Sequence, residues 1–302
     1  MTLTDPKFFR QLDRLRIRMG AARGHRPGET PIPRTNQAWG VEFESHKEYA
    51  PGDDFRYLDW NAAGRLNQLL VKTFVAEREI PCHIMVDTSA SMAAPAQDKK
   101  FAFTLDIAAA LGYIVLSSNN TLRIVELSSP SKKYGPVHAT PFLRHRARFQ
   151  QVQSFFTPLV ASGETYLQES IESYIGRTKE PGIVILISDF MVPSEHYRAA
   201  ILFLVGRGYN VKALHIIGDK ELRPERLFRR GKLRDIETQR ERRITLNAAN
   251  LEKYKKVFAT HLRGIREFCH QHRVFYACLN STTPVSDAIT NTLTREGLLT
   301  IH

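Results

Sequence analysis

The chain has 302 residues, of which 42% are hydrophobic and 25% are charged. This composition is typical of a globular protein, and the length suits one large domain or two small ones. No apolar run is expected to span a bilayer, and the amino-terminal segment lacks the apolar stretch of a signal peptide. Three cysteines without metal-type spacing favour a reducing compartment, so a cytoplasmic location is predicted.

The net charge of +12 would attract nucleic acid, anionic lipid or an acidic protein. Basic residues concentrate in residues 10–34 and 223–243, and acidic residues interrupt the second stretch. Both stretches are interpreted as solvated basic faces. No recognition-helix or zinc-finger pattern accompanies them, so we expect no specific nucleic-acid partner, only salt-sensitive attraction.

The predicted elements begin with a basic helix over residues 8–19 and a Gly- and Pro-rich linker over residues 20–33. After residue 81 the apolar pattern alternates between strands and helices. Strands are predicted at 82–87, 121–127, 182–188, 211–217 and 274–279. Helices are predicted at 98–118, 146–159, 165–177, 194–207 (capped by Ser194), 251–272 and 285–297. An extended excursion is expected over 132–143 and a hairpin over 231–246.

This alternation predicts an α/β fold, with a doubly wound, mostly parallel sheet and helices on both faces. Three parts are expected: a basic helix and linker (1–36), a segment packing on the main domain (37–80), and the main domain (81–302). In such sheets, ligands bind outside the carboxyl ends of the strands, where the strand order reverses.

A candidate metal-binding loop follows the first strand of the main domain. Asp87, Ser89 and Ser91 stand at alternate positions directly after it. One carboxylate and two hydroxyls in a tight loop suit Mg²⁺, which prefers oxygen ligands and keeps positions open when protein ligands are few. The alternative is a helix amino terminus capped by Asp87 or Ser89.

Two further loops carry matching side chains. Thr165 ends the sequence Ser-Gly-Glu-Thr at a helix start, and Asp189 follows the most apolar strand. Convergence of the three loops would gather two carboxylates and three hydroxyls, an oxygen-only site that suits Mg²⁺ or Mn²⁺. Each residue also has a purely structural interpretation, since Thr165 could cap its helix and Asp189 the following turn.

The three-loop pattern resembles the von Willebrand factor A domain and its metal-ion-dependent adhesion site, over about residues 82–302. The resemblance implies that a divalent ion, Mg²⁺ in preference to Mn²⁺ or Ca²⁺, is held by five residues: Asp87, Ser89, Ser91, Thr165 and Asp189. It also implies that an acidic residue of a partner completes the coordination. Glu164, beside Thr165, departs from the family pattern and could alter the charge or partner choice.

A second unusual segment precedes the main domain. A Pro-Gly turn is followed by acids and an arginine interleaved with aromatic residues. Its signature residues are Pro51, Gly52, Asp53, Asp54, Arg56, Asp59 and Trp60. Arg56 could bond bidentately to one of the three aspartates. The favoured interpretation is structural, with aromatic rings packed on the main domain over a satisfied ion network; the alternative is a docking surface.

With residues 39–43, 71–79 and 87–92, this signature resembles the bacterial family of domain of unknown function 58. In that family, Pro-Gly-Asp-Asp-x-Arg-x-x-Asp-Trp stands just before a von Willebrand A-like domain. The resemblance implies a metal-dependent adaptor that works with a MoxR-type AAA+ ATPase. Many members carry membrane helices ahead of the signature, and no such helix is expected here.

The leading functional hypothesis is therefore a non-enzymatic adaptor that docks an acidic side chain of an ATPase or a protein client. The alternative is a metal-dependent hydrolase or phosphatase with Asp87 at its centre. Phosphatases of the haloacid dehalogenase type need a second Asp two residues on, where this chain has Ser89. Nucleophile-elbow, zincin and phosphate-loop motifs are also missing from the sequence, which favours the adaptor.

Overall fold

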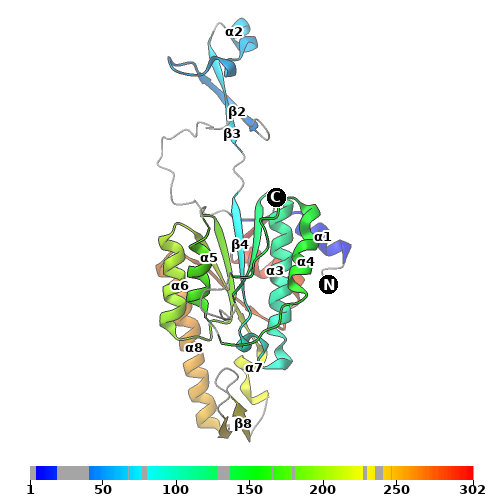
Figure 1. The fold of residues 1–302 in the computed structure, drawn as a ribbon, viewed down its shortest axis with the longest axis vertical. Helices are drawn as coiled ribbons and strands as arrows, with labels where there is room; N and C mark the ends of the chain where they lie inside the picture. The colour runs from blue at the N-terminus through cyan, green and yellow to red at the C-terminus, as the bar shows by residue number, and fades with distance from the viewer. Residues whose placement is uncertain are drawn as a thin grey trace. The chain divides into compact units, whose positions relative to one another are not determined.

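The computed structural model describes residues 5–18, 41–66, 68–76, 80–127, 137–164, 166–178, 181–226, 230–234, 241–245 and 247–301. The chain divides into two compact units (Figure 1). Unit 1 comprises residues 1–24 and 80–302, and unit 2 comprises residues 25–79. Each unit is described by itself.

Unit 1 is built around a five-stranded parallel sheet. Its strand order is β10-β7-β6-β4-β5. The strands are β4 (Pro81–Asp87), β5 (Thr121–Leu127), β6 (Ile183–Ser188), β7 (Asn210–Ile217) and β10 (Phe275–Asn280). The central strand β6 is buried at every position, as expected for a parallel strand covered on both faces. All five predicted strands are confirmed to within one residue at each end.

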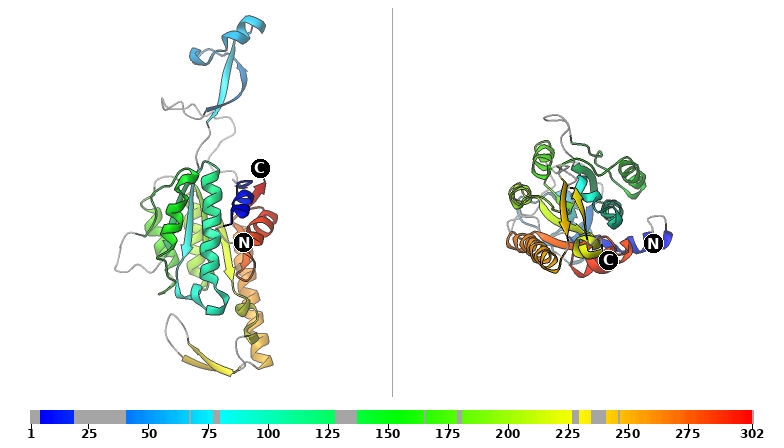
Figure 2. Two further views of the ribbon diagram at one scale, coloured as in Figure 1. Left: turned by 90° about the vertical axis from the view of Figure 1, so that its right-hand side faces the viewer. Right: turned by 90° about the horizontal axis from the view of Figure 1, so that it is seen from below.

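Helices pack in two separate hydrophobic clusters, one against each face of this sheet (Figure 2). One cluster contains α1 (Pro6–Leu12), α3 (Lys100–Ser117), α4 (Phe149–Phe156) and α9 (Val285–Asp287) with the adjoining π-helix η6 (Ala288–Leu293). The other contains α5 (Leu167–Ile175), α6 (Ser194–Gly206) and α8 (Ala248–Gln271). The predicted α/β class and the cover on both faces agree with this arrangement.

The strand order reverses between β4 and β6. From β4 the chain continues to its edge neighbour β5, then crosses to β6 on the other side of β4, and from there adds β7 and β10 outward. The connections that leave β4 and β6 therefore diverge, and the loops at the carboxyl ends of these two strands are neighbours at the corner where a ligand site is expected in such a sheet. Asp87 ends β4 and Asp189 directly follows β6.

The smaller elements of unit 1 connect this frame. They are η2 (Ala90–Ala93), η3 (Ala96–Asp98), η4 (Arg146–Arg148), α7 (Asp219–Leu222), η5 (Pro224–Arg226), β8 (Arg230–Arg234) and β9 (Glu241–Thr245). The last two strands pair antiparallel, which confirms the predicted hairpin. The excursion after β5 falls partly outside the described residues, but Ala139 and Leu143 form antiparallel bridges to β5.

The amino-terminal prediction was wrong in its extent. The helix expected over residues 8–19 ends at Leu12, and Leu15–Ile17 forms strand β1 instead. This strand pairs antiparallel with β11 (Leu299–Ile301), a strand that was not predicted from the sequence. Leu15 and Ile17 are buried and Arg16 between them is not, a period of two that sequence spacing alone did not separate from a helical stripe. Pairing with the distant carboxyl terminus decides the conformation.

Two helix ends also differ from expectation. Ser194 is the first residue of α6 rather than its cap; Pro193 holds the cap position and the cap makes no side-chain hydrogen bond. The final helix, expected over 285–297, is a short α-turn followed by the π-helix η6, and Gly297 has a left-handed φ of 86°. Glycine tolerates this conformation, so the chain turns there into β11.

One segment corrects the expectation that no stretch could span a membrane. Within the described residues, Ala96–Ser117 is long and apolar enough by length and composition, because an 18-residue window within it has a mean hydropathy of 1.5. Of that window, 72% is buried inside the unit, and a core helix of a soluble protein passes the same test. The predicted cytoplasmic location is therefore not tested by this helix.

Unit 2 is an antiparallel pair of strands with a short helical excursion between them. Strand β2 (Val41–Glu48) pairs with β3 (Leu70–Ala76) through a register with one irregularity. Between them lie the 3₁₀ turn η1 (Phe55–Tyr57) and helix α2 (Trp60–Leu66). Leu58 bridges to Val71, and both side chains are buried. The signature segment therefore forms the connection of a hairpin.

Candidate functional site

Asp87 is the buried carboxylate at the end of β4. Its Oδ1 accepts a hydrogen bond from the Ser89 backbone N–H at 2.9 Å, and its Oδ2 accepts one from the Ser188 hydroxyl at 2.6 Å. Burial raises the pKa of Asp87 to about 6, and the negative charge of Asp189 adds to the shift. The structure thus holds Asp87 where a negative charge is costly unless a cation lies nearby.

Ser89, Ser91 and Asp189 form a chain of oxygen atoms beside Asp87. The two hydroxyl oxygens are 3.0 Å apart, and the Ser91 hydroxyl donates to Asp189 Oδ1 at 3.1 Å. The same Oδ1 accepts from the Met191 N–H, so Asp189 also caps its turn, as the structural alternative expected. The predicted convergence of the first and third loops is therefore found.

The second loop is fixed to the first by backbone hydrogen bonds. The Ser162 N–H donates to the Thr88 carbonyl at 2.8 Å, and the Ala90 N–H donates to the Gly163 carbonyl at 2.9 Å. Gly163 has a φ of 79°, a left-handed conformation that favours glycine. Thr165 lies outside the described residues, so its predicted role as a ligand stays a prediction.

The alternative that these residues cap helices is tested for Ser89 and for the start of α5. Ser89 holds the cap position of η2 but makes no side-chain cap hydrogen bond, so its hydroxyl is directed to Ser91 instead. Tyr166, not Thr165, holds the cap position of α5. Glu164 is exposed and accepts a hydrogen bond from the Tyr166 hydroxyl at 2.6 Å.

Lys100 and Glu221 complete the site, and sequence reasoning missed both. The Lys100 ammonium donates to Asp189 Oδ2 at 2.8 Å and to Glu221 Oε1 at 2.5 Å. The Lys100 and Asp189 side chains are each 1% exposed, and that of Glu221 is 11% exposed. Burial alone would lower the pKa of Lys100, but the two carboxylates outweigh it and raise the pKa, so the ammonium keeps its charge.

Glu221 belongs to α7 and is held at a definite position. Its second oxygen, Oε2, accepts a hydrogen bond from the Gly218 N–H at 2.7 Å. Burial raises the pKa of Glu221, whereas the adjacent Lys100 ammonium and the Gly218 hydrogen bond oppose that shift. Within the described residues, no three His, Cys, Asp or Glu side chains are grouped to hold a metal, so any ion here would need the serine hydroxyls as ligands.

The sequence does contain a signal for Lys100. It stands three, four and seven residues before Phe103, Thr104 and Ile107, all buried on one stripe of α3. A lysine on an apolar helical stripe is expected to be buried and paired. Glu221 offers no comparable signal, because it lies in a four-residue helix whose position depends on the chain path after β7.

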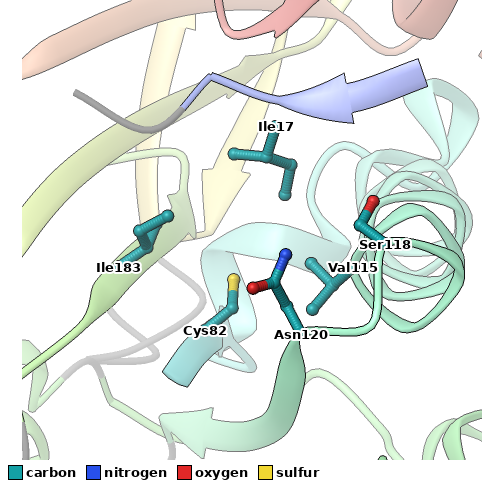
Figure 3. A pocket seen from close by; sticks show the side chains of 6 residues that line it. All are labelled: Ile17, Cys82, Val115, Ser118, Asn120 and Ile183. Atoms are coloured by element: carbon teal, nitrogen blue, oxygen red, sulfur yellow. The ribbon is translucent and has the colours of Figure 1, made fainter. Parts of the chain in front are cut away.

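A small pocket lies among Ile17, Cys82, Val115, Ser118, Asn120 and Ile183 (Figure 3). Cys82 and Ile183 stand near the starts of β4 and β6, so the pocket lies at the opposite edge of the sheet from Asp87. Its volume is about 10 Å³, roughly the room that one water molecule needs. Burial raises the pKa of the Cys82 thiol to about 12, which leaves it unreactive.

The signature segment in unit 2 carries a set of ion pairs. Arg56 bonds bidentately to Asp54, with Nη2 to Oδ2 at 2.6 Å and Nε to both carboxylate oxygens. Asp53 pairs with Lys47 at 2.5 Å. The carboxylate of Asp59 hydrogen-bonds His46 and accepts from the backbone N–H groups at the start of α2, and these bonds lower the pKa of Asp59 to about 2. The predicted ion network is present, with Asp54 as the partner of Arg56.

The aromatic residues of this segment differ from the favoured interpretation. Trp60 is 69% exposed and Phe55 is 64% exposed, although the Phe55 ring stacks on Tyr49 at 5.5 Å between centroids. Among the residues of unit 2 whose burial is described, Leu58 and Val71 are the buried apolar side chains, which leaves little core to cover these rings. Packing of the segment on the main domain stays a prediction, and the role of Pro51 and Gly52 is that of the turn before η1.

A comparison of the sequence with known families gives a match over most of the chain. The family described as "Protein of unknown function DUF58" matches residues 45–263, and the chain belongs to this family. Among curated proteins, "Uncharacterized protein Rv1480" of Mycobacterium tuberculosis is 24% identical over 227 residues, which cover 73% of this chain and 68% of the relative. The family expectation is therefore confirmed, and it brings no established activity with it.

Two solved structures show distant similarity. The conserved hypothetical protein BatB from Bacteroides thetaiotaomicron is 14% identical, with 72% of this chain and 98% of that chain covered and a TM-score of 0.40. A von Willebrand factor type A protein from Catenulispora acidiphila is 15% identical, with 50% and 36% covered and a TM-score of 0.34. Similarities at this level carry no conclusion about function or ligand.

Proposed function

We propose that the protein is a metal-dependent adaptor that docks an acidic side chain of a partner at the Asp87 corner. One observation carries the proposal: the charges of the described residues at this site do not balance. Asp87 and Asp189 are buried, and Glu221 is largely buried beside them. Among the described residues, Lys100 is the one ammonium hydrogen-bonded to this group, so the three carboxylates in their ionised forms carry two more charges than it does. Buried charge of this kind calls for a cation.

The oxygen atoms are suitably spaced for such an ion. Neighbouring ligands of an octahedral Mg²⁺ at 2.0–2.1 Å stand about 3.0 Å apart. The Ser89–Ser91 and Ser91–Asp189 oxygen separations are 3.0 and 3.1 Å. These three side chains would hold the ion, with Asp87 behind them supplying negative charge; Thr165 is proposed as a further ligand from the family resemblance. Mg²⁺ is the proposed ion, with Mn²⁺ or Ca²⁺ as alternatives.

The bound ion would supply an open coordination position that a carboxylate from another protein can fill. The resemblance to von Willebrand A domains supports this docking mode, and the resemblance to the family of domain of unknown function 58 supports a MoxR-type AAA+ ATPase as the partner. The three free cysteines suit a reducing compartment, so the adaptor is proposed to work in the cytoplasm.

Titration calorimetry with Mg²⁺, followed by capture of the MoxR-type ATPase from the same genome, tests the proposal. The wild type should bind Mg²⁺ and retain the ATPase only when Mg²⁺ is present, not in EDTA. Ser91→Ala should lose both, because it removes the hydroxyl that links Ser89 to Asp189. Ser194→Ala, at the exposed start of α6, is the matched control and should behave as wild type. Capture that is equal with Mg²⁺ and EDTA would contradict the proposal.

The hydrolase alternative is disfavoured by the surroundings of Asp87. A nucleophilic aspartate must be reached by its substrate, whereas the Asp87 side chain is 1% exposed and both of its carboxylate oxygens already accept hydrogen bonds. A phosphatase screen with Mg²⁺, using wild type and Asp87→Ala, separates the two hypotheses. Turnover that depends on Asp87 would favour the enzyme.

A further inference from the structure

The Lys100 ammonium lies on the same carboxylate that the proposed ion would use. Asp189 presents Oδ1 to Ser91 and Oδ2 to Lys100. The two oxygens of a carboxylate are about 2.2 Å apart. A divalent ion bound to Oδ1 and an ammonium bound to Oδ2 of Asp189 would therefore repel each other. In a buried setting, water screens this repulsion only weakly.

Glu221 gives the ammonium a second place to bind. Its Oε1 already accepts from Lys100, and its Oε2 is fixed by the Gly218 N–H. The ammonium has three N–H donors, so it can release Asp189 and remain hydrogen-bonded to Glu221. Glu221 is held in place for this exchange, because the Gly218 N–H bonds its other oxygen.

We propose that Lys100 is an internal cation that competes with the divalent ion for Asp189, with Glu221 as the carboxylate that retains the ammonium when the ion binds. This inference rests on the proposed metal-dependent function and adds what sets its affinity and selectivity. Lys100 weakens binding of every cation, and it weakens binding of highly charged cations most, because the repulsion grows with the charge of the ion.

The sign of the Lys100→Met effect decides between competition and simple positioning. If Lys100 competes, Lys100→Met binds Mg²⁺ at least about tenfold more tightly, and the gain for Tb³⁺ is larger still. If Lys100 only holds Asp189 in place, the variant binds Mg²⁺ more weakly. Calorimetry measures Mg²⁺ and terbium luminescence measures Tb³⁺. Lys99→Met, which removes the same charge from the adjacent exposed residue, is the control and should change affinity by less than about twofold.

Glu221 is tested by a double-mutant cycle. Glu221→Gln should weaken Mg²⁺ binding about threefold or more in the wild-type background, because the displaced ammonium keeps only a neutral amide acceptor in place of a carboxylate. In the Lys100→Met background the same substitution should have little effect, since no ammonium is left to displace. Asp219→Asn, on the same short helix, matches the change in charge. An equal loss in Glu221→Gln and Asp219→Asn, independent of Lys100, would overturn the role of Glu221.

The outcomes for the inference and for the proposed function are distinguishable. Mg²⁺ binding by wild type with weaker or unchanged binding by Lys100→Met overturns the inference and leaves the adaptor intact. Binding by Lys100→Met alone supports the inference and overturns a metal-dependent adaptor in the wild-type protein. Binding by neither overturns both. Should Lys100→Met fail to fold, the charge-balanced Lys100→Met/Glu221→Gln protein decides, with about tenfold tighter binding expected under competition.

Discussion

Lys100 in unit 1 and Arg56 in unit 2 each pair with an aspartate within 3 Å, but their surroundings are opposite. The side chains of the Lys100–Asp189 pair are 1% exposed, whereas those of Arg56 and Asp54 are 75% and 42% exposed. Water solvates the second pair whether or not it forms, and it cannot solvate the first. The Lys100–Asp189 pair therefore constrains a buried site in unit 1, whereas the Arg56–Asp54 pair lies at the surface of unit 2 and constrains little.

The largest effect is expected from Lys100→Met in EDTA. It leaves Asp189 and Glu221 buried without their ammonium and should lower the free energy of unfolding by about 3–5 kcal/mol. Denaturant unfolding followed by far-ultraviolet circular dichroism measures this, because most of the helix and sheet belongs to unit 1. Added Mg²⁺ should restore part of the loss if it binds the site. A loss below about 1 kcal/mol would mean that the Lys100 pair behaves like the exposed Arg56 pair.

A smaller loss of stability, which depends on pH, is expected from Asp87. Its folded pKa of about 6 lies above the ordinary 3.8, so the folded state favours the protonated acid. The resulting stability is fully present below about pH 4 and is lost as the pH rises through about 6, to the extent of about 2–3 kcal/mol. Asp87→Asn mimics the protonated form and removes this change.

The measurement is the stability difference between wild type and Asp87→Asn in EDTA from pH 4 to pH 7. Wild type should lose stability relative to the variant over that range, and Mg²⁺ should reduce the loss because a cation favours the ionised carboxylate. A wild type that gains stability relative to Asp87→Asn as the pH rises would show that Asp87 is not destabilised by burial.

Glycine-to-alanine substitutions compare the packing of the two units, as the ion pairs compare their charges. A methyl group at Gly218 would meet the Asp98 side chain, with its Cβ only 2.8 Å from the Asp98 Cβ, whereas one at Gly64 would meet nothing within 4 Å. Gly218→Ala should therefore destabilise unit 1 by about 1–3 kcal/mol. Gly64→Ala, in the middle of helix α2, should stabilise unit 2 by about 0.5–1 kcal/mol.

The readouts for the two glycine variants are independent. Both tryptophans of the chain, Trp39 and Trp60, belong to unit 2, so tryptophan fluorescence follows unit 2 and circular dichroism follows mainly unit 1. If Gly218→Ala shifts the tryptophan transition as far as it shifts the circular-dichroism transition, the two units unfold together.

The sequence predicted the strand-end residues of the site, but not the charged partners Lys100 and Glu221. Asp87, Ser89, Ser91 and Asp189 were found because a run of apolar residues marks each strand and the chemistry follows directly after it. Strand ends of a parallel sheet meet at one edge, so local patterns were enough to bring these residues together. The same reasoning could not test Thr165, which lies outside the described residues.

Long-range partners were the part that could not be predicted. Strand β1 depends on pairing with β11 from the other end of the chain, and Lys100 depends on Glu221, which is 121 residues away. Ser188 was placed in a strand, yet its hydroxyl is the partner of Asp87. In each case, the deciding contact joins residues whose spacing in the sequence carries no periodic signal.

The smallest effect is expected from Arg56→Gln in unit 2. The substitution removes a bidentate pair with good geometry, yet the free energy of unfolding should change little, because water solvates Asp54 once the guanidinium is gone. Tryptophan fluorescence during denaturant unfolding measures it, and 1 M NaCl should abolish even this difference. A loss as large as that of Lys100→Met would mean that the pair is buried in the native protein, which would favour the packing of the signature segment against another surface. A small loss would agree with an exposed Arg56–Asp54 pair that is accessible to a binding partner.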